Sequence, residues 1–519
     1  MALAACESGD SSRPGEIGLV VGFAGGVSAD EPRAAVVGRD VLASGGNAAD
    51  AAVAMAFTMS VTLPSRASLA SGGSCVVFDP LQERTQAVLF PIGKSEAGAP
   101  IPGMPRGMAA LHATFGGVRW ESLLIAAEQY ARFGHGISRA FARDIRVRPR
   151  DLYADPEARR IVLDDGTDLP VEGDELVQAE LSSVLSGLRQ QGAGYFYTGN
   201  FARRFAEAAS AIGQRMTPEE IRDYRARLED TVSVKVGNEL AHVPPAPGAA
   251  GIVAAEILGM IGGSGPRDFA DVSANERLHL FVEASKRAFA DRGEWLTRSG
   301  GVSMPGQEIV APERLDRLFQ GYSPERATPV SELASEPRAV GEDPNSAGLV
   351  VVDRAGMAVA CSFSMNQIFG TAQIAPGTGI MMAAPPRPTG GGEISLTPLL
   401  LVNSNINDAF FAATATAGPA APTVLTQVML RALQLDDDLE TAVGAPRVHH
   451  MGVPNVVWHE PELPEERKQS LSARGHQLRE VPHFGRLNAI SCPRGVRRRP
   501  ELCQAQSDPR GFGLAERVE

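Results

Sequence analysis

The sequence lacks an apolar run of about 18 residues, the length with which a helix crosses a membrane. Its longest candidate, residues 51–63, is interrupted by Thr58, Ser60 and Thr62. Aromatic side chains are scarce at 6% of 519 residues, whereas glycine (55) and proline (37) are frequent, which favours many turns. The net charge of −12 provides no cationic excess for phosphate groups, so nucleic acid is excluded as the main partner.

Cysteine is also scarce, with five residues, and none of them forms the C-x-x-C pair that is typical of a metal site. Cys492 and Cys503 lie on either side of a basic cluster, Arg494 and residues 497–499. Proline and glycine surround these arginines, so we expect a solvated hairpin loop there. The sequence leaves two interpretations of the flanking cysteines open: a disulfide in an exported protein, or small apolar side chains in strands.

The first residues combine two conflicting signals. Leu3-Ala4-Ala5-Cys6 resembles the processing box of bacterial lipoproteins, and a polar stretch follows at residues 7–12. Only five residues precede Cys6, too few for the charged and apolar parts of a secretory signal. We expect residues 1–12 to be a truncated lipoprotein signal and tether, with Cys6 as a candidate lipid anchor of a periplasmic or membrane-anchored protein; the alternative is a chance match.

Helix start and stop signals recur along the chain. Glycines at 45–46 and Asn47 separate helical patterns at 36–42 and 48–57, with glycine ending the first helix and asparagine capping the second. Residues 217–220, TPEE, combine a cap, a first-turn proline and the glutamate of a capping box. Further helices are expected within 106–145 and at 199–212, 273–293 and 422–433.

Apolar runs separated by short turns predict paired strands. The expected pairs are 75–78 with 86–90, 349–352 with 358–363, and 398–402 with 408–416; single strands are expected at 231–236 and 456–459 and within 485–519. Strands accompanied by flanking helices predict an α/β or α+β layered fold.

The character of the chain changes within EDPNSAGLVVVD, residues 342–353. The part before Ser346 is polar and turn-rich, and the part after it is an apolar, strand-forming run. A serine hydroxyl can attack the preceding carbonyl, here that of Asn345, and the resulting ester can hydrolyse. Cleavage would leave Ser346 with both a hydroxyl and a free α-amine, whose ordinary pKa of about 7.7–8.0 suits a base near neutral pH. Taken alone, an Asn-Ser pair is more often a simple turn.

A set of motifs in a fixed order shifts the balance from a simple turn towards self-cleavage at this junction. GGNAADAAV at 45–53, the turn at 64–78, KRAFAD at 286–291, APRVHH at 445–450 and DPR at 508–510 follow one another along the chain. Together with segments 217–224, 350–353, 369–370 and 376–380, they resemble the γ-glutamyltransferase (γ-glutamyltranspeptidase) family of N-terminal-nucleophile hydrolases. The resemblance covers nearly the whole chain.

The resemblance implies a four-layer αββα sandwich. Residues 13–345 match the family's large subunit and residues 346–519 its small subunit, in a single intertwined domain whose fragments stay associated after cleavage between Asn345 and Ser346. The family begins its small subunit with Thr-Thr-His, whereas this sequence has Ser-Ala-Gly at 346–348. Serine supports the same chemistry but lacks the methyl group that restrains the side-chain rotamer.

Site residues are implied position by position. Ser346 is the expected nucleophile, and Ser364 is the second catalytic residue, orienting the amine or hydroxyl of the first. Asn366 is expected to bind polar groups of the substrate. The serine pair that helps to bind the substrate carboxylate in the family becomes Ile394 and Ser395, so half of it is kept.

Other family features are replaced. The Gly-Gly pair of the oxyanion hole becomes Ala420 and Ala421, which keep backbone N–H groups but resist positive φ. The arginine that binds the substrate carboxylate falls at Pro91, and the acidic loop falls at 383–388, where Arg387 is the one charged candidate for substrate binding. Each lost charged contact removes roughly 1.5–3 kcal/mol of binding free energy.

Three hypotheses remain open. In the first, the chain is a γ-glutamyl hydrolase or transferase. In the second, it is a self-cleaved amidohydrolase that acts on a small amide or peptide with a less polar acyl group. In the third, it is an unprocessed, non-catalytic relative that binds a ligand or partner. No cofactor and no metal is expected. Neighbouring strand residues point to opposite faces, so His449 and His450 are interpreted as packing residues.

Overall fold

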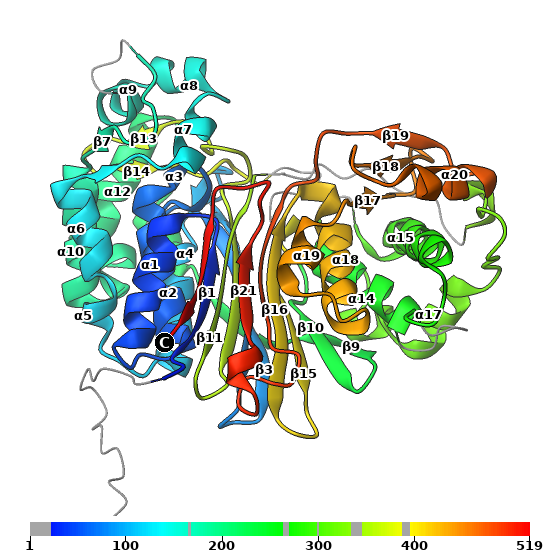
Figure 1. Cartoon of the computed structure of the whole chain (residues 1–519). Helices are drawn as coiled ribbons and strands as arrows, with labels where there is room; N and C mark the ends of the chain where they lie inside the picture. Colours follow the sequence, from blue (N-terminus) through cyan, green and yellow to red (C-terminus); the bar gives the residue numbers. More distant parts are fainter. Residues whose placement is uncertain (1–21, 164–167, 263–268, 298–299, 334–344, 387–394) are drawn as a thin grey trace, which may run out of the picture.

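The computed structural model describes residues 22–163, 168–262, 269–297, 300–333, 345–386 and 395–519. Two β-sheets form its centre (Figure 1). The first sheet has the strand order β22 (Leu514–Val518), β1 (Gly25–Ala29), β11 (Ala347–Asp353), β12 (Ala358–Ser364), β2 (Gly72–Asp79), β3 (Arg84–Phe90) and β8 (Arg227–Asp230). The second has the order β21 (Gln504–Ser507), β20 (Arg486–Ser491), β16 (Asp408–Thr416), β15 (Leu399–Asn403), β10 (Glu239–Val243) and β9 (Val232–Val236).

Helices cover the outer face of each sheet (Figure 1). The helices over the first sheet include α1 (Pro32–Ala43), α2 (Ala48–Thr62), α4 (Met104–Phe115), α6 (Ile125–Phe133), α10 (Ala179–Gln191) and α12 (Gly199–Ala211). Those over the second are α14 (Ala249–Gly262), α15 (Ala274–Trp295), α18 (Ala421–Gln434) and α19 (Leu439–Gly444), with α20 (Glu465–Ala473) further out. A separate apolar cluster that includes Val350 and Leu400 fills the space between the sheets. The expected αββα order is therefore confirmed, and every sequence-predicted strand pair forms.

Both halves of the chain contribute strands to both sheets. The first sheet combines β1, β2, β3 and β8 from before residue 346 with β11, β12 and β22 from after it, and the second combines β9 and β10 with β15, β16, β20 and β21. The subunit boundary at 345/346 stays a prediction. Residues 1–12 and Cys6 lie outside the described residues, within which no helix is long and apolar enough to cross a membrane.

Helix α2 fixes the far end of strand β11. Asn47 caps α2, as the sequence predicts, and the structure adds a capping box with Asp50; all fifteen residues of the helix are buried. The small alanine side chains let α2 lie close against the sheet. Asp353, at the end of β11, accepts a hydrogen bond of 2.9 Å from the Ala48 N–H. Burial raises the pKa of Asp353 to about 6.

Gly348 marks a close approach between the two sheets. A Cβ atom at this position would lie 2.3 Å from Cγ2 of Thr414 in strand β16. Such a separation is far shorter than a van der Waals contact, so no side chain fits here unless the Thr414 side chain shifts. Gly348, which replaces the family's histidine, therefore allows the two sheets to pack closely beside Ser346.

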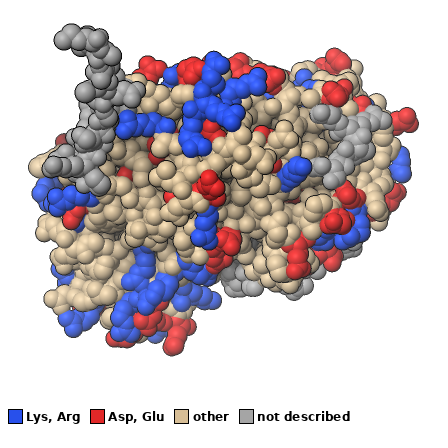
Figure 2. Space-filling model, turned by 90° about the horizontal axis from the view of Figure 1, so that it is seen from below, with Lys and Arg blue, Asp and Glu red and all other residues tan. Residues whose placement is uncertain are grey.

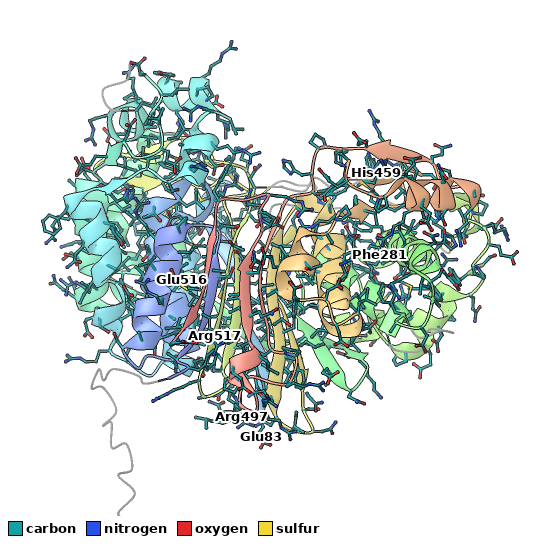
Figure 3. All side chains as sticks on the ribbon, in the orientation of Figure 1. Glu83, Phe281, His459, Arg497, Glu516 and Arg517 are labelled. Atoms are coloured by element: carbon teal, nitrogen blue, oxygen red, sulfur yellow. A yellow bond between two sulfur atoms is a disulfide. The ribbon has the colours of Figure 1, made fainter. Side chains whose placement is uncertain are left out.

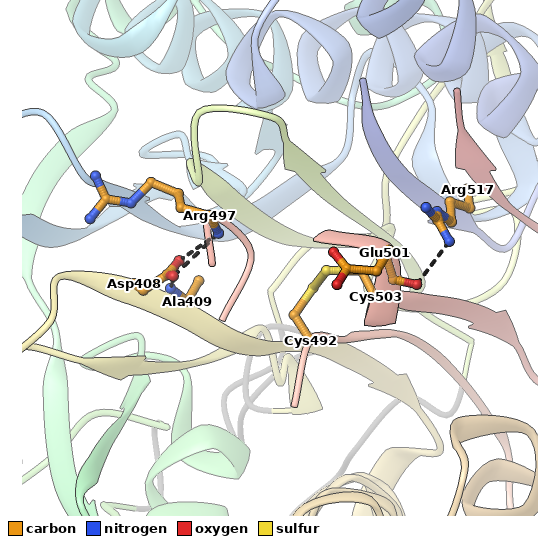
Figure 4. The surroundings of a disulfide bond; sticks show 7 residues. All are labelled: Asp408, Ala409, Cys492, Arg497, Glu501, Cys503 and Arg517. Carbon is orange, nitrogen blue, oxygen red and sulfur yellow. Dashed lines mark hydrogen bonds between the residues drawn. A yellow bond between two sulfur atoms is a disulfide. The ribbon is translucent and has the colours of Figure 1, made fainter. Parts of the chain in front are cut away.

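The basic cluster lies in the loop between β20 and β21, as expected, at the lower end of the sheets (Figure 3). Cys492 and Cys503 are joined by a disulfide across this loop, which resolves the alternative left open by the sequence (Figure 4). The Arg497 N–H donates to both oxygens of Asp408, each at 3.2 Å. On the face seen from below, basic and acidic side chains are interspersed (Figure 2).

Candidate active site

Ser346 lies at the entrance to strand β11, at the end of the sandwich opposite the C-terminus (Figure 1). Ala347 pairs with Phe363, so the register brings Ser346 opposite Ser364, the last residue of β12. Both serines are buried, with 1% and 0% exposure. The Oγ atom of Ser346 is buried and forms no hydrogen bond to any described residue. Because buried hydroxyls are normally paired, this one is a candidate for chemistry.

Ser364 is held in place by the turn that follows it. Its Oγ accepts a hydrogen bond of 2.9 Å from the backbone N–H of Asn366, which leaves its own O–H proton able to donate. Asn366 has a φ of 63°, the left-handed conformation that asparagine tolerates. Its Nδ2 donates to the Ala384 carbonyl at 2.9 Å, so this amide anchors the segment after β14 (Ile380–Met381).

Two arginines bind the carbonyl oxygen of Ser346. Nη1 of Arg66 lies 3.4 Å from that oxygen, and Nη2 of Arg486 lies 3.3 Å from it. Arg66 belongs to the short helix α3 (Pro64–Ala67), and Arg486 begins strand β20. Neither arginine is predicted from the sequence, because nothing in the linear pattern connects positions 66, 346 and 486.

Each arginine is paired with a buried aspartate. Asp144, in α7 (Arg139–Ile145), accepts from Arg66 through both oxygens at 2.5 and 2.6 Å and also from Ser65. Asp30, directly after β1, lies 3.3 Å from Nε of Arg486. Burial lowers the pKa of Arg486, and the neighbouring charge of Arg66 lowers it further. The four charges balance, which limits the cost of burying them beside the nucleophile.

Asp30 also connects the two sheets at this point. It accepts hydrogen bonds from the Gly348 N–H at 2.9 Å and from Oγ1 of Thr416, at the end of β16, at 3.3 Å. The Asp30 N–H in turn donates to the Gly348 carbonyl at 3.1 Å. These contacts fix the first residues of β11 relative to the second sheet, so the backbone of Ser346 has little freedom.

Ala420 and Ala421 follow β16 at the same edge. Ala420 ends the 3₁₀ turn η4 (Gly418–Ala420), and Ala421 begins α18. Their φ values are −82° and −55°, while the positive φ of 54° falls on Gly418, so alanine fits both positions without strain. The Ala420 N–H donates to the Ala417 carbonyl at 3.1 Å. The concern that alanine resists the required backbone conformation is therefore wrong for this chain.

The structure describes some of the remaining predicted site residues and not others. Ser395 is buried just before β15, on the same edge of the second sheet, and Asn345 is half-buried. Arg387 and Ile394 lie outside the described residues. Pro91, at the position of the family's arginine, uses its carbonyl to accept a hydrogen bond of 2.7 Å from the hydroxyl of Tyr224.

The structure contains a buried polar cluster that the sequence analysis missed. His279, Glu283 and His476 offer potential metal ligand atoms within 4.8 Å of one another. However, Nζ of Lys286 lies 2.8 Å from Glu283, and Arg287 contacts the same carboxylate at 2.5 Å. Burial by itself would raise the pKa of Glu283, but Lys286 and Arg287 lower it to about 2. Since the carboxylate already carries two cations, we interpret the cluster as an ion-pair network that holds α15.

A four-layer αββα sandwich with a buried hydroxyl residue at the start of a central strand defines the class of N-terminal-nucleophile hydrolases. The family model for gamma-glutamyltranspeptidase matches residues 34–384 and 393–518, nearly the whole chain. The chain therefore belongs to the gamma-glutamyltranspeptidase family, whose matched members include glutathione hydrolases and acylases, and this supports a γ-glutamyltransferase-like hydrolase.

Individual relatives include both glutathione hydrolases and acylases. The chain is 25% identical to the glutathione hydrolase proenzyme of Escherichia coli (strain K12) over 513 residues, covering 90% of this chain and 88% of the relative. It is 27% identical to the acylase ACY 1 proenzyme of Pseudomonas sp. (strain SE83) over 514 residues, covering 91% and 90%. The fold matches cephalosporin acylase from Bacillus halodurans with a TM-score of 0.80 and 22% identity, over 100% of this chain and 99% of the other.

Proposed function

We propose that this enzyme cleaves its own backbone between Asn345 and Ser346 and then uses Ser346 as the N-terminal nucleophile of an amidohydrolase or acyltransferase. The observation that carries the proposal is the Ser346 hydroxyl, which is buried beside Ser364 without a hydrogen bond to any described residue. The two arginines that hold its carbonyl support it further, because they restrict the backbone at the bond to be broken.

Self-cleavage needs only groups of the chain itself and one water molecule. The Oγ atom of Ser346 attacks the carbonyl carbon of Asn345, the C–N bond breaks, and the hydroxyl proton passes to the departing nitrogen. Water then hydrolyses the ester, which releases the carboxylate of Asn345 and leaves Ser346 with a free α-amine. In turnover, this amine accepts the Ser346 proton while Oγ attacks the substrate amide, and it returns that proton to the departing amine as the C–N bond breaks. The acyl group then passes from Oγ to water or to an acceptor amine, which releases the Ser346 hydroxyl again.

Ser364 and the start of α18 complete the proposed machinery. The O–H of Ser364 can donate to the amine or hydroxyl of Ser346 and so orient it. The N–H groups of Ala420 and Ala421 donate to the carbonyls of Ala417 and Gly418, so an oxyanion at the start of α18 would have to share these donors with the turn. Asn366 and Ser395 border the substrate, and Arg387 remains a predicted contact.

The acyl group is proposed to be less polar than γ-glutamyl. Pro91 replaces the arginine expected to bind the carboxylate, and Ala383 and Ala384 begin the segment where acidic residues are expected. Each missing charged contact removes roughly 1.5–3 kcal/mol of binding free energy, so a zwitterionic acyl group is no longer selected. Two relatives of similar identity carry the name acylase.

One observation favours a second candidate, an unprocessed relative that binds a ligand or partner without catalysis. Ser346 is only 1% exposed, so a substrate cannot reach its hydroxyl while the chain is arranged in this way. Self-cleavage at Asn345 would free the chain ends there, whereas an intact chain would leave the site closed.

The deciding experiment follows cleavage and hydrolysis together. On a reducing denaturing gel, purified protein should give two fragments, and the smaller one should begin at Ser346 by N-terminal sequencing. Ser346→Ala should stay intact, and Ser346→Thr should still cleave. The cleaved enzyme should hydrolyse butyryl or phenylacetyl anilides at least tenfold faster than the γ-glutamyl anilide. A single band identical to that of Ser346→Ala would favour the non-catalytic candidate.

We further propose that the enzyme works in an oxidising compartment outside the cytoplasm. Its two disulfides, Cys75–Cys361 and Cys492–Cys503, support this location, because such bonds are rare where thiols are kept reduced. A lipid anchor at Cys6 would fit the same location and remains a sequence prediction. Both fragments are expected to stay together after cleavage, because each sheet contains strands of both.

A further inference from the structure

A hollow lies in the helical layer over the second sheet, between α15, α18, α19 and α20. Phe281 lies on its wall and marks this layer in Figure 3. The α18 residues that line it, from Gln427 to Arg431, come about two turns after Ala421. The hollow is therefore separate from the surroundings of Ser346, and nothing in the proposed mechanism uses it.

Four arginines contribute to the walls of this hollow: Arg277, Arg431, Arg447 and Arg467. Arg277 is held by three backbone carbonyls, those of Phe269, Ala270 and Val272, at 2.9–3.0 Å. Carbonyls fix its position without neutralising its charge. Burial lowers the pKa of Arg277, and repulsion from Arg467 and Arg431 lowers it further.

These cations are only partly compensated. Arg431 pairs with Asp437 at 2.6 Å, whereas no described residue forms an ion pair or side-chain hydrogen bond with Arg467. Arg447 pairs with Asp508 but is 2% exposed, and its Nε finds no acceptor among the described residues. The Nε of Arg431 is likewise buried and unpaired. Buried guanidinium donors without acceptors are costly, so an anion in the hollow would relieve them.

The rest of the wall is apolar. Phe269, Leu278, Phe281 and Leu463 line the hollow together with Val428 and Leu435. An apolar wall with a few converging charged groups is typical of small-molecule sites. We propose that this hollow binds an amphipathic carboxylate, with its hydrocarbon or aryl body against the apolar wall and its carboxylate on Arg467, Arg431 and Arg277.

The test measures binding of octanoate by calorimetry to the full chain, with octan-1-ol and acetate as matched probes. Octanoate should bind at least tenfold more tightly than octan-1-ol, and acetate should give no measurable heat. Ser346→Ala should bind octanoate as the wild type does, because the hollow is remote from the nucleophile. Equal binding of octanoate and octan-1-ol would overturn the carboxylate assignment.

Variants locate the site. Arg467→Gln removes the least compensated cation without breaking a described ion pair, and it should weaken octanoate binding about tenfold while leaving octan-1-ol unchanged. Leu435→Ala should weaken both probes. Arg317→Gln, an exposed arginine of α17 (Pro312–Phe319) that does not line the hollow, should bind both as the wild type does. Octanoate binding that is unaffected by both Arg467→Gln and Leu435→Ala would overturn the proposal.

Discussion

Cys75 and Cys361 stand directly opposite each other in β2 and β12 and are joined by a disulfide. Cys75 precedes Ser346 and Cys361 follows it, so this bond links the two segments that self-cleavage would separate. Cleavage would then leave two polypeptides held by a covalent bond as well as by shared sheets. The sequence predicts a strand around Cys75 but contains no sign of this partner.

The disulfide makes the outcome of a gel depend on reductant. Cleaved protein should run as one species near full length without reductant and as two fragments with it. Cys361→Ser should give two fragments under both conditions, because only the covalent link is lost. Separate fragments of the wild type on a non-reducing gel would show that the Cys75–Cys361 bond does not form.

Breaking the buried ion pair between Arg66 and Asp144 should destabilise the protein. Asp144→Asn leaves the buried Arg66 without a charged partner, and we expect a loss of about 3–5 kcal/mol in the free energy of unfolding, measured in urea. Asp230→Asn, in an exposed pair with Arg84, should cost less than about 1 kcal/mol. Similar losses for the two variants would contradict this account.

A double substitution separates stability from positioning. Arg66→Met combined with Asp144→Leu replaces the buried pair with apolar groups and should recover most of the stability. Cleavage at Asn345 should nevertheless stay slower than in the wild type, because the carbonyl of Ser346 loses one of its donors. Recovery of a wild-type cleavage rate would mean that Arg66 acts only through packing.

The close approach at Gly348 gives a rescue experiment. Gly348→Ala forces a Cβ against Cγ2 of Thr414, and overpacking of this kind costs about 1–3 kcal/mol in the free energy of unfolding. Thr414→Ser removes that methyl group and keeps the hydroxyl. In thermal unfolding, the double variant should therefore be more stable than Gly348→Ala alone. If the stability losses of the two single variants simply add in the double variant, the close contact with Cγ2 of Thr414 is not the cause.

Acid should weaken the fold through three buried histidines. Burial lowers the pKa of His449, His450 and His476 to about 3, so the unfolded chain binds protons at these sites as pH falls through about 6.5 while the folded chain does not. The free energy of unfolding should therefore fall with pH between about 6.5 and 3, by roughly 1.4 kcal/mol per pH unit for each histidine.

Denaturant titrations at pH 5.5 and 4.5 check this slope. His449→Gln should reduce it by roughly one proton equivalent. His483→Gln, at an exposed position, should leave it unchanged. Equal slopes for wild type and His449→Gln would show that His449 is already protonated in the folded protein.

Most helices and strands were predictable because their signals are local. Asn47 forms the expected cap, and Thr217 with Glu220 forms the expected capping box. The strand pairs on either side of 353–356 and 403–407 follow from apolar runs around short turns. The sandwich itself followed from the family resemblance, since local patterns limit a fold to a class and do not order its strands.

The candidate site was predictable only in part. Ser346 and Ser364 were selected from the sequence, and the register of β11 and β12 brings them together. Arg66, Asp144, Asp30 and Arg486 were not, because they come from four separate segments and meet only where the two sheets end.

The sequence by itself determined the change from a polar to a strand-forming run at Ser346, the absence of a long apolar span and the order of the elements, because each depends on neighbours along the chain. Only the tertiary structure decided which charges surround the nucleophile and which cysteines pair. Those contacts join residues up to several hundred positions apart, and their free energy exists only once both sheets have packed and excluded water.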